Sequence, residues 1–173
     1  MNYAAYVEAK GFDVITSSEV LASRIVPQML RNLGINNIER SGDEVLNDLF
    51  PIVRDSGLME IVDGELYKDG PMRPLDSDKE DVVMAFKTGE DGQFQEGYVV
   101  INIYVPDIDN GSGGNTKNSA RTTAISQACY EIFENKSFGE YLFWYGNMVN
   151  TFSEDEIGQH FVNIDLRFKH VIY

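Results

Sequence analysis

The chain has 173 residues, of which 43% are hydrophobic and 24% charged, as expected for a soluble globular protein with one sizeable core. Its formal net charge is −14. Sequence-independent affinity for nucleic acids comes from clustered lysine and arginine, so this charge argues against direct binding to DNA or RNA.

The start of the chain argues against export. Glu8, Asp13 and Glu19 interrupt any apolar leader within residues 1–20, and no apolar run approaches the roughly 20 residues that a membrane span needs. Cys129 is the only cysteine, which excludes an internal disulfide. We therefore expect a cytoplasmic protein without membrane contact.

Residues 1–40 are predicted to form a helical N-terminal extension ahead of a single domain that covers residues 41–173. Thr16 and Glu19 have the spacing of a capping box, in which each side chain satisfies the other's backbone amide. An apolar stripe follows at intervals of four: Leu21, Ile25, Met29 and Leu33. Pro27 should kink or restart this helix. The sequence leaves open whether the extension docks on the domain or projects from it.

A second capping box, formed by Ser41 and Glu44, opens the predicted domain. Its helix carries an apolar stripe of Leu46, Phe50 and Val53, and Pro51 predicts a bend. From residue 60 the hydrophobic period changes to two, which predicts strands. The pair at residues 63–64, Asp-Gly, is compatible with a hairpin turn and with a break inside one strand, and we keep both alternatives.

The best strand prediction covers residues 95–106, "QEGYVVINIYVP". It is preceded by a strand with Val82, Met84 and Phe86 on one face and by a glycine-containing reversal at 88–93. One face of the long strand carries Val99, Ile101, Ile103 and Val105, and the other carries Tyr98, Val100, Asn102 and Tyr104. Because neither face is strongly polar, we expect a central strand whose second face, Tyr98, Val100, Asn102 and Tyr104, contacts another subunit or a partner.

The segment that follows this strand, "VPDIDNGSGGNTKNSARTT", has the composition of a ligand loop. A calcium loop that starts at Asp107 fails at its fifth, sixth and twelfth positions, and Lys117 lacks the neighbours of a phosphate loop. We interpret the segment as an exposed, flexible connector, with Asn118 or Ser119 capping the next helix. The residues assigned to this flexible loop are Asp107, Asp109, Gly111, Gly113 and Gly114.

An amphipathic helix is predicted up to Phe133, with Ala124, Ala128 and Ile132 beside Ile125, Cys129 and Phe133. In that stripe Cys129 is interpreted as a buried apolar residue and not as a nucleophile. An aromatic strand or strand pair comes next, in which Tyr141, Phe143, Trp144 and Tyr145 favour packing over a ligand pocket.

The last predicted strand alternates apolar residues (Val162, Ile164, Leu166 and Phe168) with polar ones (Asn163, Asp165, Arg167 and Lys169). His160 and His170 share its apolar parity but are ten positions apart, about 33 Å in an extended strand, so they cannot bind one metal ion. A weak match to the PD-(D/E)xK nuclease pattern combines Asp107 with Glu134 and Lys136. We expect no catalytic residue, no cofactor and no metal.

The predicted order of elements gives an α+β fold: a mostly antiparallel sheet of four to five strands with helices on one face. Three segments, "GYVVINIYVPD", "ARTTAISQACYEIF" and "SEDEIGQHFVNIDLRF", follow one another in the order of the tail completion (tail terminator) proteins of long-tailed bacteriophages. Residues 43–173 resemble that family, and "MRPLDSDKEDVVMAF" is similar to phage-like proteins of gut bacteria.

The resemblance implies a non-catalytic subunit that assembles into a homo-oligomeric ring, commonly a hexamer, at the head-tail junction. Its partners would be tail-tube and head-tail connector proteins, and it would become a virion component where the phage is active. Two alternatives stay open: a domain that binds a small ligand, and the nuclease. The sequence does not give the ring size or distinguish an active phage from a prophage remnant.

Overall fold

The computed structural model describes residues 41–69, 72–90 and 95–170. The helix expected within residues 1–40 lies outside them. The described residues fold into three α-helices, nine strands and one short 3-10 turn. In chain order they are α4 (Gly42–Arg54), α5 (Leu58–Ile61), β1 (Leu66–Lys68), β2 (Val82–Glu90), β3 (Gln95–Pro106), β4 (Ile108–Asp109), β5 (Asn115–Thr116), α6 (Ser119–Phe133), β6 (Lys136–Phe138), β7 (Tyr141–Tyr145), β8 (Asn150–Glu154), η3 (Asp155–Ile157) and β9 (Gln159–His170).

One seven-stranded sheet organises the fold, with the order β1-β2-β3-β9-β7-β6 and with β8 paired to β9. All its pairs are antiparallel except β1 with β2. The α+β class is therefore confirmed, and β3 lies at the centre of the sheet as predicted. The sheet has more strands than the four to five expected, because β1 and β6 have only three residues each and show no period.

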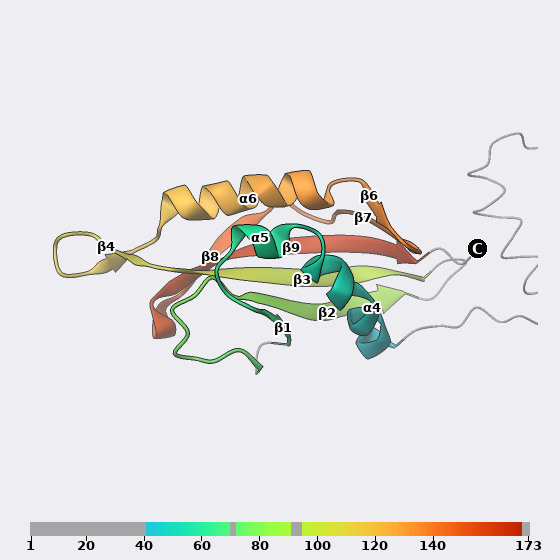
Figure 1. Cartoon of the computed structure of the whole chain (residues 1–173), viewed down its shortest axis with the longest axis horizontal. Helices are drawn as coiled ribbons and strands as arrows, with labels where there is room; N and C mark the ends of the chain where they lie inside the picture. Colours follow the sequence, from blue (N-terminus) through green and yellow to red (C-terminus); the bar gives the residue numbers. More distant parts are fainter. Residues whose placement is uncertain (1–40, 70–71, 91–94, 171–173) are drawn as a thin grey trace, which may run out of the picture.

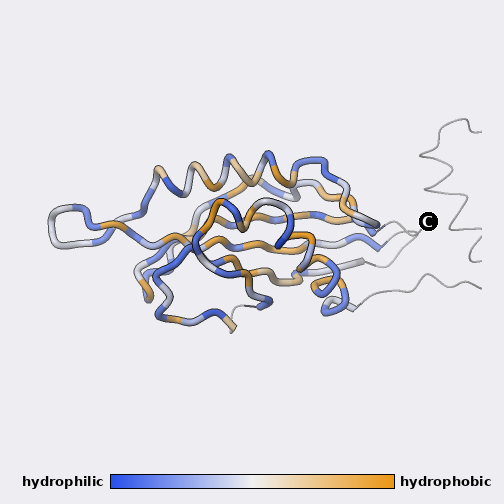
Figure 2. The backbone as a smooth tube through the Cα atoms, in the orientation of Figure 1, coloured by the Kyte–Doolittle hydropathy of each residue, from blue (hydrophilic) through white to orange (hydrophobic). Residues whose placement is uncertain are grey.

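The helices cover one face of this sheet. The apolar positions of β2, β3 and β9 match across the register, as in Met84 opposite Ile101 and Ile101 opposite Ile164. They join α4 and α6 in one core whose members are almost fully buried. Figure 1 shows α6 running along the strands, and Figure 2 shows the hydrophobic colour concentrated on the central strands. The predicted faces of β3 and β9 are confirmed.

Helix α4 begins as the sequence predicts. The Ser41 hydroxyl accepts a hydrogen bond from the Glu44 amide, and the Glu44 carboxylate accepts one from the Ser41 amide at 2.8 Å. Pro51 lies inside the helix and does not end it. The buried side is broader than the predicted stripe: Val45, Leu46, Leu49 and Val53 are buried, whereas Phe50 packs at its margin.

The expectation of strands from residue 60 onward is wrong at its start. Residues 58–61 form α5, and the Asp-Gly pair is neither a hairpin turn nor a break within a strand but connects α5 to β1. A Cβ at Gly64 would lie 2.6 Å from the Asp81 backbone nitrogen, so these two segments of the chain can approach this closely only with glycine at position 64. The Asp63 carboxylate accepts a hydrogen bond from the Glu80 amide at 2.8 Å. Contacts with the residues just before β2 therefore determine the conformation of this turn.

Helix α6 begins at its predicted cap, because the Asn118 side chain accepts a hydrogen bond from the Arg121 amide. Thr122, Ile125, Cys129 and Phe133 are buried, whereas Ala124 is exposed. The predicted apolar stripe was therefore too wide.

A glycine at the sheet centre tests the packing of the two central strands. A Cβ at Gly97 would lie 2.5 Å from the Thr88 carbonyl oxygen and 2.9 Å from the Phe168 ring. We expect Gly97→Ala to lower the free energy of unfolding by about 1–3 kcal/mol, because the backbone or the buried ring must move. Gly114→Ala is the matched control, since its Cβ would meet only the Asn110 side chain at 3.4 Å. Urea unfolding of both variants checks this, and equal stability of the two would contradict the packing.

Candidate functional site

The candidate site is the sheet face that lies opposite the helices, called here the open face. Side chains of β3 alternate, so Tyr98, Val100, Asn102 and Tyr104 share this face and are half-buried, whereas their neighbours in the chain are buried under α4 and α6. Within the described residues no helix lies on the open face. The structure therefore brings together the four residues predicted as an interface, and their role stays a prediction.

An aromatic row crosses the open face near the start of β9. Phe152 of β8, Phe161 of β9 and Tyr104 of β3 are neighbours in the register, and their ring centroids are 5.6 Å and 5.4 Å apart. The Arg73 guanidinium lies over the Tyr104 ring at 4.1 Å. Phe152 remains 49% exposed. This end of the face offers apolar area of the kind that is enriched in interface cores.

Burial raises the pKa of the Tyr104 hydroxyl, and the Glu154 carboxylate adds to this shift. Ionisation of this hydroxyl is therefore disfavoured. Tyr104 is therefore a neutral side chain that combines a ring with a hydroxyl.

Polar pairs occupy the middle of the open face. Asn163 donates a hydrogen bond to Asn102 across the strands at 2.7 Å. The Asp165 carboxylate is 8% exposed and accepts hydrogen bonds from Lys87 at 3.0 Å and from Asn147 at 2.7 Å. Val100 lies directly opposite Asp165. The polar side chains in the middle of the face thus form hydrogen bonds with one another, and few of their donors and acceptors remain for other contacts.

The far end of the face, near the end of β9, is cationic. The Arg167 guanidinium lies 5.8 Å from the Tyr98 ring centroid and 5.3 Å from that of Trp144. Arg167 and Lys169 both contact the Glu96 carboxylate, at 2.7 Å and 3.3 Å. A hollow of about 110 Å³ adjoins Arg167 and Tyr98. It is smaller than the roughly 300 Å³ at which ligand pockets begin, so this hollow is too small for a cofactor.

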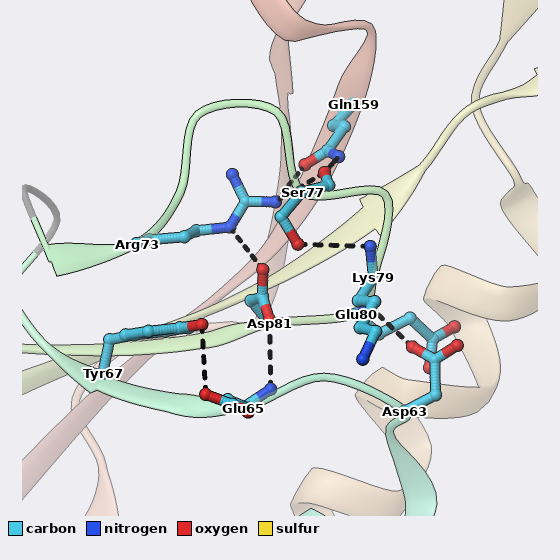
Figure 3. A network of polar contacts seen from close by, with 9 residues as sticks. All are labelled: Asp63, Glu65, Tyr67, Arg73, Ser77, Lys79, Glu80, Asp81 and Gln159. Carbon is cyan, nitrogen blue, oxygen red and sulfur yellow. Dashed lines mark hydrogen bonds and ion pairs between the residues drawn. The ribbon is translucent and has the colours of Figure 1, made fainter.

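A buried polar network closes the aromatic end, as Figure 3 shows. Arg73 donates to Asp81 at 3.0 Å and to Gln159 at 2.7 Å, and the Arg73 and Asp81 side chains are 5% and 1% exposed. Asp81 also accepts a hydrogen bond from the Glu65 amide, and Gln159 donates to the Ser77 carbonyl. These hydrogen bonds connect the loop before β2 with two other segments, Glu65 just before β1 and Gln159 at the start of β9. We assign a structural role to this network.

The loop after β3 forms a small β-hairpin, β4–β5, that extends beyond the sheet at one end of the molecule (Figure 1). Asp109, Gly111, Gly113 and Gly114 are exposed, as predicted for a connector, and its flexibility stays a prediction. Asp107 differs from them: its side chain is 10% exposed, and its carboxylate lies 2.6 Å from His160 Nδ1. This pair anchors the root of the hairpin to β9.

The remaining candidate residues are not brought together. Asp107 precedes the hairpin and Glu134 caps the other end of α6, a helix of 15 residues and about 22 Å, so the two carboxylates cannot share an ion. His170 contacts Glu140, far from His160 along β9. No group of three or more metal-ligating side chains occurs in the described ranges. Burial raises the pKa of the Cys129 thiol to about 12, which suits a core residue and not a nucleophile.

The aromatic group considered as a ligand pocket is divided between the two faces. Tyr141 and Phe143 are buried in the core, Trp144 lies on the open face beside Arg167, and Tyr145 packs against Tyr130 at a centroid distance of 4.7 Å. They do not surround a common cavity. Among the helices of the described part, none has the length and apolarity to cross a membrane.

The sequence interpretation missed most members of the open face that come from other strands. Phe152, Phe161 and Arg167 were not assigned to the interface. The polar parity of residues 163–169 was a signal for Arg167 and Asp165, but their alignment with Tyr98 and Val100 requires the register of β3 with β9. Arg73 gave no signal, since a loop carries it onto Tyr104.

Comparisons with known proteins add little. No protein-family model and no curated protein matches the chain. A solved structure whose name states no function is similar over 73% of this chain and 96% of its own, with 12% identity and a TM-score of 0.43. A likeness of this size carries no argument about function.

Because Arg73 belongs to the network of Figure 3, a stability measurement can distinguish a structural role of this residue from a binding role. We expect Arg73→Ala to lower the free energy of unfolding by about 3–5 kcal/mol, because it leaves the buried Asp81 carboxylate without its cation. Arg54→Ala is the control, since the Arg54–Asp55 pair is mostly exposed and should leave the urea midpoint unchanged. An Arg73→Ala protein as stable as the wild type would mean that the arginine serves a ligand or partner instead.

Proposed function

We propose that this protein is a non-catalytic structural subunit that assembles with copies of itself through the open face, as a ring-forming tail completion protein at a phage or prophage head-tail junction. The observation that carries the proposal is the open face itself. Its aromatic row, polar middle and cationic end lie on a sheet of which, among residues 41–69, 72–90 and 95–170, the helices cover only the other face. Its partners would be further copies of the chain, a tail tube and a head-tail connector.

The composition of the open face supports assembly. Aromatic residues and arginine are enriched at protein interfaces, and Tyr98, Tyr104, Phe161, Trp144 and Arg167 are all present on it. Exposed apolar side chains extend the face at its margins: Leu142 is 39% exposed and Phe152 49%. Exposed apolar side chains that gather on one face are typical of an interaction surface.

The charge supports a place on a DNA conduit. Residues 1–40 hold four of the 14 lysines and arginines and four of the 28 acidic residues, so the net charge of −14 falls on residues 41–173. A strongly negative wall repels phosphates, which lets DNA pass a channel without adhering. The charge does not identify the channel, and it supports the proposal only together with the open face.

Substitution on the open face tests assembly. We expect Val100→Lys to weaken self-association at least tenfold, because an ammonium group would be desolvated in the contact, while in the monomer it can reach Asp165 or water. Ala124→Lys, on the exposed side of α6, is the matched control and should assemble like the wild type. Native mass spectrometry over a concentration series, with a melting curve for each variant, gives the result.

Phe152→Lys repeats this test at an exposed position of the same face, in case Val100→Lys unfolds the protein. If both variants fold and associate like the wild type, the open face is not the contact. If Ala124→Lys weakens assembly equally, the effect is general and the proposal loses its support.

A second measurement addresses the charge. We expect no appreciable affinity for double-stranded DNA at about 0.15 M salt, because phosphate contacts dominate such binding and the domain has few cations. A mobility-shift titration measures it. Binding that weakens steeply with added salt would contradict the role on a conduit, and magnesium-dependent cleavage would return the nuclease to consideration.

A further inference from the structure

Two patches of opposite charge lie at the two ends of β9. The cationic patch is defined by Lys87, Arg167 and Lys169 with the carboxylates Glu96 and Asp165, five side chains with a net charge of +1. The backbone of Glu90 lies opposite Glu96 at the margin of the patch. It stands out because the rest of the domain is strongly acidic.

Lys87 and Arg167 are the most accessible members of this patch, whereas Lys169 is 25% exposed, less than Glu96. The Lys87 and Arg167 side chains are 53% and 40% exposed, whereas Asp165 is 8% and Glu96 31% exposed. A molecule that approaches the patch therefore meets positive charge first. Arg167 uses one N–H on Glu96, and its plane lies between Tyr98 and Trp144. This arrangement holds the guanidinium still and leaves donors for a second carboxylate.

The acidic turn consists of Glu154, Asp155 and Glu156, between β8 and β9. Asp155 and Glu156 are exposed, and Glu154 is half-buried beside the aromatic row. The root of the β4–β5 hairpin is attached to the same turn, since the Asp107 amide donates to the Gly158 carbonyl. This hydrogen bond connects the segment that carries the acidic turn to the hairpin.

The two patches cannot meet within one chain. β9 runs from Gln159, next to the acidic turn, to Arg167 and beyond, so at 3.3 Å per residue the patches are about 26 Å apart. Each is also at an end of the same open face. Two different surfaces at opposite ends of one subunit are what a head-to-tail contact between identical subunits requires.

We propose that the acidic turn of one copy docks on the cationic patch of the next copy, with Arg167 as the central contact. This inference rests on the proposed function, since it assigns the pairing within the ring. Charge complementarity sets the register of the copies, and the aromatic row supplies apolar area beside it. A second copy of this chain carries the complementary surface, because the two patches are opposite in sign.

Charge exchange tests the contact. The patch variant combines Glu96→Lys, Arg167→Glu and Lys169→Glu, which keeps opposite charges opposed inside the patch but reverses its net sign. The turn variant combines Asp155→Lys and Glu156→Lys. Lys136→Glu, at an exposed position on β6, changes the total charge as much as the patch variant and serves as its control.

The expected outcome is complementation. Each variant alone should self-associate at least tenfold more weakly than the wild type at low salt, with an unchanged melting curve, and Lys136→Glu should associate normally. An equimolar mixture of the two variants should recover assembly, and so should one chain that carries all five substitutions. Native mass spectrometry reads the stoichiometry, and added salt should weaken the wild-type assembly.

Other outcomes decide against one proposal or both. If neither variant weakens the wild-type assembly, or if the mixture stays monomeric, the contact between the acidic turn and the cationic patch is overturned. The ring proposal is left standing in that case. Complementation that yields only closed dimers supports the contact and overturns the ring. A wild type that stays monomeric at all accessible concentrations overturns both.

Discussion

The pairing of β3 with β9 is the constraint on which the rest of the structure depends. All twelve residues of β3 have a partner in β9, from Gln95 opposite His170 to Pro106 opposite Gln159. Because the side-chain period of a strand is two, this register assigns each residue to one of two faces, and a slip by one position would exchange them. The apolar sets of both strands coincide on the same face, which is the strongest reason for the register to be unique.

That division fixes both the core and the candidate surface. On one side the matched apolar residues are covered by α4 and α6, and burial of such side chains contributes on the order of 1.5–3 kcal/mol each. On the other side the same register aligns aromatic, amide and charged residues into rows that cross three or four strands. The proposed interface is therefore a consequence of the core, since the residues that alternate with buried ones must form the opposite face.

Loops complete the two ends of this arrangement. At one end Arg73 donates to both Asp81 and Gln159, and these bonds hold a loop against Tyr104. At the same end the hairpin is anchored through Asp107 and His160. At the other end Arg167 lies between two rings above Glu96. The aromatic end uses its polar groups in buried pairs, whereas the cationic end keeps exposed hydrogen-bond donors. The two ends can therefore make different contacts, and this difference motivates the head-to-tail assembly.

The sequence by itself determined the elements whose signal is local: the capping box of α4, the Asn118 cap of α6, and the alternation of β3 and β9. It also divided β3 into an aliphatic face (Val99, Ile101, Ile103 and Val105) and a mixed face (Tyr98, Val100, Asn102 and Tyr104). Only the tertiary structure decided that residues 58–61 are helical, that the Asp107 carboxylate pairs with a histidine, and that Phe152, Phe161, Arg73 and Arg167 join the face of Tyr98 and Tyr104. Short strands such as β1 and β6 have too few residues to show a period, and a cross-strand neighbour depends on register. Register is set by the summed burial of several strands at once, so no single segment of the sequence contains it.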